Sequence, residues 1–299
     1  MNKVFLLAAQ EDWIVDRFVN EWNLDNQDIT TKNPYNADVI WLFASWCWKH
    51  IPHDLLKSKK VITTIHHIVP EKFDTVAQQD FLFRDSVTTC YHVYNESTKT
   101  FVERLTNKPV NVIPYWANQK IWRVTSTKQD VRKKYNLNID DFIVGSFQRD
   151  TEGYDLKSPK LEKGPDLLVD YLDNLYQNQK NLHVVLAGWR RQYVISRLQG
   201  LGIPFTYFER PQHDVINELY QSLDLYPVTS RCEGGPQSLI ECGLLSVPVV
   251  SRDVGIAKQV LLKESISNDI KLAKPSVPNV EGWMLPHGYE PYRNLIVGL

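Results

Sequence analysis

Short apolar runs alternate with amphipathic segments along the whole chain. The apolar runs are continuous rather than alternating, which is typical of strands buried on both faces of a parallel sheet. Between two such runs, residues 164–179 place Leu167, Leu168, Tyr171 and Leu172 on one helical stripe. The pattern predicts an α/β protein. Its predicted strands are residues 3–9, 37–44, 60–66, 86–93, 110–116, 142–147, 183–188, 205–210, 223–230 and 247–252.

This number of strands favours two sheets over one. A charged stretch that is poor in apolar residues, 120–141, separates the two sets of strands. We therefore expect two Rossmann-like, doubly wound parallel-sheet domains that face each other across a cleft, with ligands at the carboxyl ends of the strands. The expected parts are an amino-terminal domain at 1–122, a linker at 123–140, a second domain at 141–280 and a tail at 281–299, for which packing back toward the first domain is one option.

The composition is that of an ordinary globular protein: 43% of the 299 residues are hydrophobic, 23% are charged, and the net charge is −1. Such a charge gives no field that attracts nucleic acid. Four cysteines without C-x-x-C spacing indicate reduced thiols. The chain has no run of about 18 apolar residues and no signal-peptide pattern, so we expect a cytoplasmic protein. A basic cluster at 120–134 favours a solvated linker, with peripheral membrane contact as the alternative.

The segment "RCEGGPQSLIEC" (231–242) places two glutamates at the carboxyl end of a predicted strand. Glu233 falls in the turn, and Glu241 falls inside the helix that follows, where it can accept hydrogen bonds from a ribose diol. Two glycines let the backbone approach a ligand, and the helix start offers N–H groups to an anion. The alternative is a surface turn with a capping carboxylate. The remaining candidate contacts in this segment are Gly234, Gly235, Pro236, Gln237 and Ser238, with the proline predicted at the first helical position.

Two cations lie near the same predicted edge. Arg149 follows the strand 142–147, and Lys163 precedes the helix that begins near Gly164. Together they are able to hold a diphosphate leaving group without a metal. The alternative is that both are ordinary surface cations paired with Asp150 or Glu162.

Other motifs limit the choice of function. The chain has no G-x-G-x-x-G, G-x-x-x-x-G-K-[ST] or G-x-S-x-G motif, which argues against a dinucleotide dehydrogenase, a P-loop NTPase and an α/β-hydrolase. The histidines of "HIPH" (50–53) suggest a metal site, but no D-x-D motif is present, so we expect no metal. Trp46 and Trp48 follow a strand and are candidates for stacking on an acceptor sugar, with packing as the alternative.

Several segments, in order, resemble the family 4 (GT4) retaining glycosyltransferases of the GT-B fold. These segments are "TIHHIVPEKF" (64–73), Arg149, "EKG" (162–164), "LAG" (186–188) and the two glutamates followed by "VPVVSRDVG". The resemblance covers most of residues 60–260. One departure is the stretch "LLAAQEDWIVD" after the first strand, which has no glycine where the family has a glycine-rich loop.

The resemblance implies a metal-independent transfer of a sugar from a UDP- or GDP-sugar to a glycan, lipid-linked or other hydroxyl acceptor. It implies that Arg149 and Lys163 bind the diphosphate, Glu233 the donor sugar and Glu241 the ribose. It also implies that His66 lies beside the donor sugar, whereas His67 stands where many members have aspartate. The alternatives are a GT-B-fold sugar-nucleotide epimerase and a non-catalytic sugar-nucleotide-binding subunit.

Overall fold

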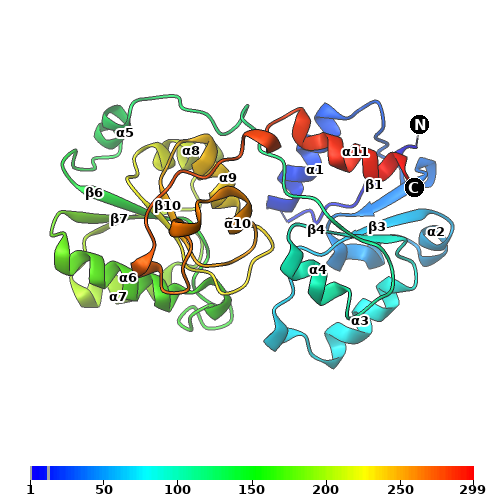
Figure 1. Cartoon of the computed structure of the whole chain (residues 1–299), viewed down its shortest axis with the longest axis horizontal. Helices are drawn as coiled ribbons and strands as arrows, with labels where there is room; N and C mark the ends of the chain where they lie inside the picture. The colour runs from blue at the N-terminus through cyan, green and yellow to red at the C-terminus, as the bar shows by residue number, and fades with distance from the viewer. Residues whose placement is uncertain (1, 12–13) are drawn as a thin grey trace. The chain divides into compact units, whose positions relative to one another are not determined.

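The computed structural model describes residues 2–11 and 14–299 and divides the chain into two units. The first unit contains residues 1–115 and 289–299, and the second contains residues 116–288. Figure 1 shows parallel strands and surrounding helices in each. All ten predicted strands are present and their pairings are parallel, so the predicted parallel α/β class is confirmed.

The first unit is built on a five-stranded parallel sheet in the order β1-β2-β3-β4-β5. Residues 29–31 add a further edge, because Val4 N donates to Ile29 O and Thr31 N donates to Val4 O. The chain thus reverses direction across the sheet between β1 and β2, as in doubly wound folds. The elements are β1 (Val4–Leu6), α1 (Ile14–Asp25), β2 (Val39–Leu42), α2 (His53–Lys57), β3 (Lys60–Thr64), α3 (Thr75–Asp85), β4 (Cys90–Val93), α4 (Glu96–Val102), β5 (Val110–Val112) and α11 (Glu290–Val297).

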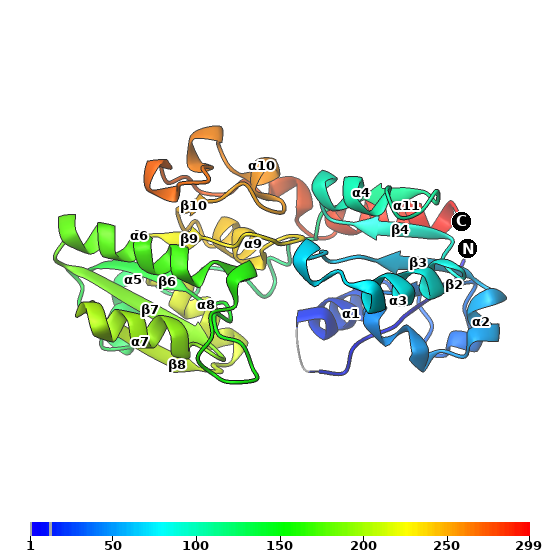
Figure 2. The same ribbon diagram turned by 90° about the horizontal axis from the view of Figure 1, so that it is seen from below.

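Side chains alternate across β4 and pack against different helices on its two faces. Tyr91 stacks on Phe81 of α3 at 5.5 Å between ring centroids. On the opposite face, His92 meets Tyr292 of α11 at 5.1 Å. The carboxyl-terminal helix therefore completes the core of the first unit, and Figures 1 and 2 show it among the amino-terminal elements.

The second unit contains a sheet of β6, β7 and β8 in the order β6-β7-β8, and β9 continues it on the β6 side. The connection is made by backbone hydrogen bonds, including Gly145 N to Leu225 O at 3.0 Å. With β10 beyond β9, the order is β8-β7-β6-β9-β10, which is also doubly wound. The elements are α5 (Lys128–Lys134), β6 (Phe142–Ser146), α6 (Pro165–Asn178), β7 (Leu182–Gly188), α7 (Gln192–Leu201), β8 (Phe205–Glu209), α8 (His213–Gln221), β9 (Tyr226–Val228), α9 (Gln237–Leu244), β10 (Val249–Ser251) and α10 (Ala257–Val260).

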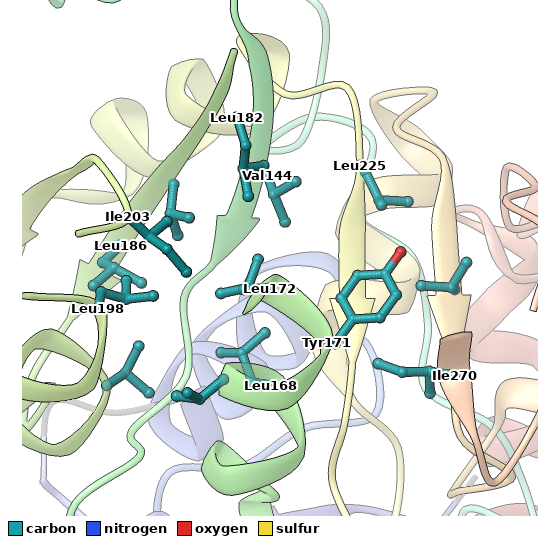
Figure 3. Close-up of a cluster of buried hydrophobic side chains, with 14 residues drawn as sticks. Val144, Leu168, Tyr171, Leu172, Leu182, Leu186, Leu198, Ile203, Leu225 and Ile270 are labelled. Carbon is teal, nitrogen blue, oxygen red and sulfur yellow. The ribbon is translucent and has the colours of Figure 1, made fainter. Parts of the chain in front are cut away.

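The core of the second unit lies between this sheet and helices α6 and α7. Leu168, Tyr171 and Leu172 of α6 pack with residues of β6 and β7, as Figure 3 shows. These are members of the apolar stripe expected from the sequence. Each buried leucine contributes about 1.5–3 kcal/mol relative to an exposed one, so the stripe fixes α6 on the sheet.

The boundaries differ from those expected. The first unit ends at Tyr115 rather than at residue 122, and residues 123–140 lie within the second unit rather than forming a linker. The reason is that the basic segment is anchored: Arg132 is buried and donates to Ser222 O and Asp224, and Lys134 pairs with Glu218 at 2.6 Å. Of the expected tail, residues 281–288 belong to the second unit and 289–299 to the first.

Candidate functional site

The candidate site of the second unit is formed by loops at the carboxyl ends of β6 and β9. The 3-10 turn Leu161–Lys163 carries Lys163, and the loop after β9 carries Glu233. Lys163 Nζ lies 2.6 Å from Glu233 Oε1, and both side chains are largely buried. The structure thus brings together two of the predicted site residues as an ion pair.

A glycine allows the two loops to approach each other this closely. Gly164 has φ +61°, and a Cβ placed there would lie 2.0 Å from Thr229 O. Glycine adopts this left-handed conformation without strain, and its missing Cβ leaves the space for the carbonyl. The contact continues with Arg231 N and Cys232 N, which donate to Glu162 O at 2.8 and 3.2 Å.

Two polar side chains connect the ion pair to β6. Ser230 Oγ lies 3.0 Å from Glu233 Oε1 and 3.2 Å from Gln148 Oε1. Gln148 Nε2 donates to Lys163 O at 2.9 Å. The residue before Arg149 is therefore bonded to the backbone of Lys163. Sequence reasoning did not identify Gln148 or Ser230, because neither stands in a recognisable motif on its own.

An exposed ion pair holds the loop from the outside. Arg231 donates to both carboxylate oxygens of Asp166 at 2.7 and 2.5 Å and to Leu161 O at 2.9 Å. The hydrogen bonds from Arg231 lower the pKa of Asp166. This bidentate pair fixes both the orientation of Arg231 and its distance from Asp166.

Glu241 lies in α9 and is buried, with 8% of its surface exposed. Its Oε2 accepts a hydrogen bond from Tyr220 Oη at 2.7 Å. Burial and the neighbouring Glu241 raise the pKa of Tyr220 well above its usual value, so the hydroxyl remains a donor. Tyr220 is a buried residue of α8, and its role in orienting Glu241 appears only in the structure.

The glycine–proline segment leads into α9 as expected, with a shift of one residue. Pro236 is the N-cap and not the first helical residue, and α9 begins at Gln237, followed by Ser238. Gly234 and Gly235 precede it in the loop. Gly255, with φ +56°, lies against this loop, since a Cβ there would be 3.0 Å from Gly234 O and 2.7 Å from Pro236 Cδ.

Arg149 lies after β6, with its guanidinium 5.2 Å from the centroid of the Trp189 ring. The sequence also left open that Asp150 or Glu162 pairs with Arg149 or Lys163, but both carboxylates pair with other cations. Asp150 is buried and pairs with Arg191, and Glu162 pairs with Lys160 at 3.2 Å.

The predicted residues of the first unit occupy different environments. His66 Nε2 is 2.9 Å from Phe43 O, and Nδ1 is 3.4 Å from Tyr115 Oη. Burial lowers the pKa of His66 to about 4, so the ring is neutral at pH 7 and has little free hydrogen-bonding capacity. His67 is exposed.

The two tryptophans predicted as acceptor contacts, Trp46 and Trp48, lie in different environments. Trp48 is buried and donates from Nε1 to Asp80 Oδ1 at 3.1 Å, which is the packing alternative rather than an acceptor contact. Trp46 is 48% exposed, and its ring lies 5.7 Å from that of His66.

The glycine-free loop after β1 has its own internal anion. The backbone N–H groups of Ala9, Gln10 and Glu11 donate to the carboxylate of Asp16 at 2.9, 2.8 and 2.7 Å. A series of N–H groups that points at one acceptor is a typical anion-binding arrangement. Here the carboxylate of Asp16, in α1, occupies it.

The described residues, 2–11 and 14–299, contain no group of three or more histidine, cysteine, aspartate or glutamate side chains arranged to hold a metal ion. None of their helices combines the length and the apolar character that spanning a bilayer requires.

Comparisons with known proteins agree with this architecture. Residues 156–268 match the family model described as "Glycosyl transferases group 1". No curated protein matches the sequence. The structure of Anabaena HepE in complex with UDP and glucose has a TM-score of 0.70 and 14% identity, over 91% of this chain and 88% of HepE.

Two further solved structures have the same architecture. A Rickettsia africae glycosyltransferase has a TM-score of 0.60 and 15% identity over 100% of this chain and 90% of its own. WaaG, a glycosyltransferase of lipopolysaccharide biosynthesis, has a TM-score of 0.61 and 11% identity over 84% and 81%. The chain therefore has the GT-B fold, and the match at residues 156–268 together with this fold supports a GT-B glycosyltransferase.

Proposed function

We propose that this protein is a retaining glycosyltransferase of the GT4 type that uses a UDP- or GDP-sugar as donor and a hydroxyl group of a glycan, a lipid-linked sugar or another molecule as acceptor. The observation that carries the proposal is the Lys163–Glu233 ion pair at the carboxyl ends of parallel strands, inside the segment that matches group 1 glycosyl transferases. Open α/β sheets bind ligands at this edge.

Each charged group has a part in the proposed reaction. Arg149 and Lys163 bind the donor diphosphate, and Glu241, oriented by Tyr220, accepts hydrogen bonds from the ribose hydroxyls. Glu233 binds donor-sugar hydroxyls next to the anomeric carbon. His66 of the first unit is proposed to act as a neutral neighbour of the donor sugar rather than as a proton donor.

The bond between the anomeric carbon and the diphosphate oxygen breaks, and its electron pair remains on the diphosphate. The acceptor oxygen then forms a bond to the same face of that carbon, and the acceptor proton passes to a diphosphate oxygen. The two cations stabilise the negative charge that develops on the leaving group. We propose that they suffice without a metal ion.

The first property to test is the nucleotide base of the donor, uracil or guanine. HepE, which shares the fold, has been solved with UDP and with UDP-glucose, so UDP-sugars are the first choice over GDP-sugars. Incubation with UDP-glucose, UDP-galactose or GDP-mannose and a panel of sugar acceptors, followed by NMR of the product, measures both transfer and anomeric configuration. We expect an α-linked product from an α-linked donor.

Two results would contradict the proposal. Conversion of the sugar nucleotide without an acceptor would indicate an epimerase. Binding of nucleotide with neither transfer nor conversion, over the whole panel, would indicate a binding subunit.

A further inference from the structure

Three arginines surround the indole of Trp189, which follows β7. The guanidinium carbons of Arg149, Arg190 and Arg210 lie 5.2, 4.2 and 4.1 Å from the centroid of the Trp189 ring. The three residues follow the carboxyl ends of β6, β7 and β8, which are adjacent in the sheet. Neighbouring parallel strands thus each supply one cation to the same point, at the edge of the sheet where ligands bind.

Two of these three arginines, Arg190 and Arg210, have no carboxylate partner among the described residues. Within residues 2–11 and 14–299, neither Arg190 nor Arg210 forms an ion pair, and Arg190 Nε has no hydrogen-bond partner. The buried carboxylate of Asp150 is already engaged by Arg191. Stacking on an indole contributes only about 0.5–2 kcal/mol per cation. Like charges gathered around one ring repel each other, and a bound anion would relieve that repulsion.

An unusual backbone conformation positions Arg190 and Arg210. Arg190 and Arg210 have φ of 58° and 46°, in the left-handed region that residues other than glycine seldom adopt. Arg190 O accepts hydrogen bonds from Asp150 N and Thr151 N, both at 3.1 Å. A Cβ at Gly153 would lie 2.2 Å from Arg190 Nη1, so the guanidinium uses space that only glycine leaves open.

We infer that Trp189, Arg190 and Arg210 form a second anion subsite beside Arg149, which takes a phosphate or carboxylate group of a substrate in addition to the donor diphosphate. The planar guanidinium matches both groups with paired hydrogen bonds. The assignment of Arg149 to the diphosphate rests on the proposed function, but the binding of an anion by Arg190 and Arg210 does not.

The first experiment measures binding of inorganic phosphate by calorimetry, in the absence of nucleotide and at saturating UDP. The variants are Arg190→Gln and Arg210→Gln, and the control is Arg197→Gln on the exposed side of α7. We expect wild type to bind phosphate even when UDP is bound. We expect each of the two variants to weaken phosphate binding roughly ten- to a hundredfold, the scale of one charge-assisted hydrogen bond, and to change UDP affinity less than twofold.

Two results would overturn the inference: no phosphate binding to UDP-saturated wild type, or a loss of UDP affinity in Arg190→Gln and Arg210→Gln as large as in Arg149→Ala. The second result would assign all three arginines to the diphosphate. If the protein binds no UDP at all, the proposed function fails, and the phosphate titration without nucleotide still tests the subsite. Thermal unfolding of each variant identifies misfolding, and Arg190→Lys supplies a charged replacement without the guanidinium fork.

A second experiment identifies the source of the anion. UDP-glucose and UDP-glucuronate differ only at C6 of the sugar, where glucuronate has a carboxylate in place of the hydroxymethyl group. If the donor carries the anion, wild type binds UDP-glucuronate more tightly and Arg190→Gln loses the difference. If the acceptor carries it, the two donors bind equally, and phosphate binds to the UDP-glucose complex.

Discussion

Lys163 Nζ lies 2.6 Å from Glu233 Oε1, so a cation and a carboxylate that are 70 residues apart in the sequence form an ion pair at the edge of the sheet. The proposed function gives them different ligands, the diphosphate and the sugar. In the proposed function the pair links the two halves of the donor, and each residue holds the other in place before the donor binds.

Substitution of Lys163 should mainly affect UDP affinity, and substitution of Glu233 should mainly affect kcat. Lys163→Ala should weaken UDP binding by about 1.5–3 kcal/mol, because one charged hydrogen bond to phosphate is lost. Glu233→Gln should bind UDP as well as wild type or more tightly, because it frees Lys163, yet lower kcat roughly a hundredfold. Calorimetry with UDP and steady-state kinetics measure both. Equal loss of UDP affinity in the two variants would contradict this division of roles.

Tyr220→Phe should lower UDP affinity in the same way as Glu241→Gln. The hydroxyl of Tyr220 is the hydrogen-bond donor that orients Glu241 Oε2, at 2.7 Å. Both variants should weaken UDP binding, and their effects should not add, because they act on one carboxylate. Tyr171→Phe, in the core cluster of α6, is the matched control. Additive effects in the double variant would show that Tyr220 acts independently of Glu241.

Gly164→Ala should reduce the free energy of unfolding by roughly 2–5 kcal/mol, from a left-handed φ and overlap with Thr229 O. Gly200→Ala is the control, because a Cβ there meets nothing within 4 Å. It lies inside α7 and should raise stability by about 0.5–1 kcal/mol. Urea denaturation of the three proteins measures the difference. A Gly164→Ala variant as stable as wild type would mean that the two loops separate at little cost.

Activity should persist in EDTA. Arg149 and Lys163 are proposed to neutralise the leaving diphosphate, and charged hydrogen bonds of this kind are able to replace a metal ion in that role. Initial rates with and without EDTA, followed by addition of Mn²⁺ or Mg²⁺, provide the measurement. Loss of activity that either ion restores would reject the metal-independent mechanism.

Stability should decrease in acid because of a buried histidine. Burial lowers the pKa of His92 from 6.5 to about 3, while its Nδ1 and Nε2 lie 3.0 Å from Thr64 Oγ1 and Ile113 O. Below pH 6.5 the unfolded chain takes up a proton that the folded protein does not bind. The free energy of unfolding should therefore fall by up to about 1.4 kcal/mol per pH unit from this residue as the pH drops toward the folded pKa.

The variant His92→Gln isolates this contribution. It should be less stable than wild type at pH 7, because two buried hydrogen bonds are disturbed, but its stability should fall less steeply between pH 6.5 and pH 4.5. Urea denaturation across this range measures the slope, and His50→Gln on the surface is the matched control. Identical slopes in wild type and His92→Gln would mean that His92 is protonated in the folded protein.

The sequence alone determined the strands, the parallel α/β class and the position of the glutamate loop. These features follow from local rules: continuous apolar runs form strands buried on both faces, and a glycine–glycine–proline segment ends a strand and begins a helix. The shift of Pro236 from the first helical residue to the N-cap is the one-residue error that such rules allow at a helix end.

Only the tertiary structure decided which side chains meet. The Lys163–Glu233 pair depends on the contact of Gly164 with Thr229 O. The orientation of Glu241 depends on Tyr220, which otherwise looks like a core residue. The three arginines at Trp189 follow the ends of three different strands. The observed boundary between the units also differs from the predicted one because of a tertiary contact. Buried Arg132 attaches the basic segment to the second unit. Such contacts join residues far apart in the chain, and local periodicity carries no information about them, because the packing of loops and helices sets their distances.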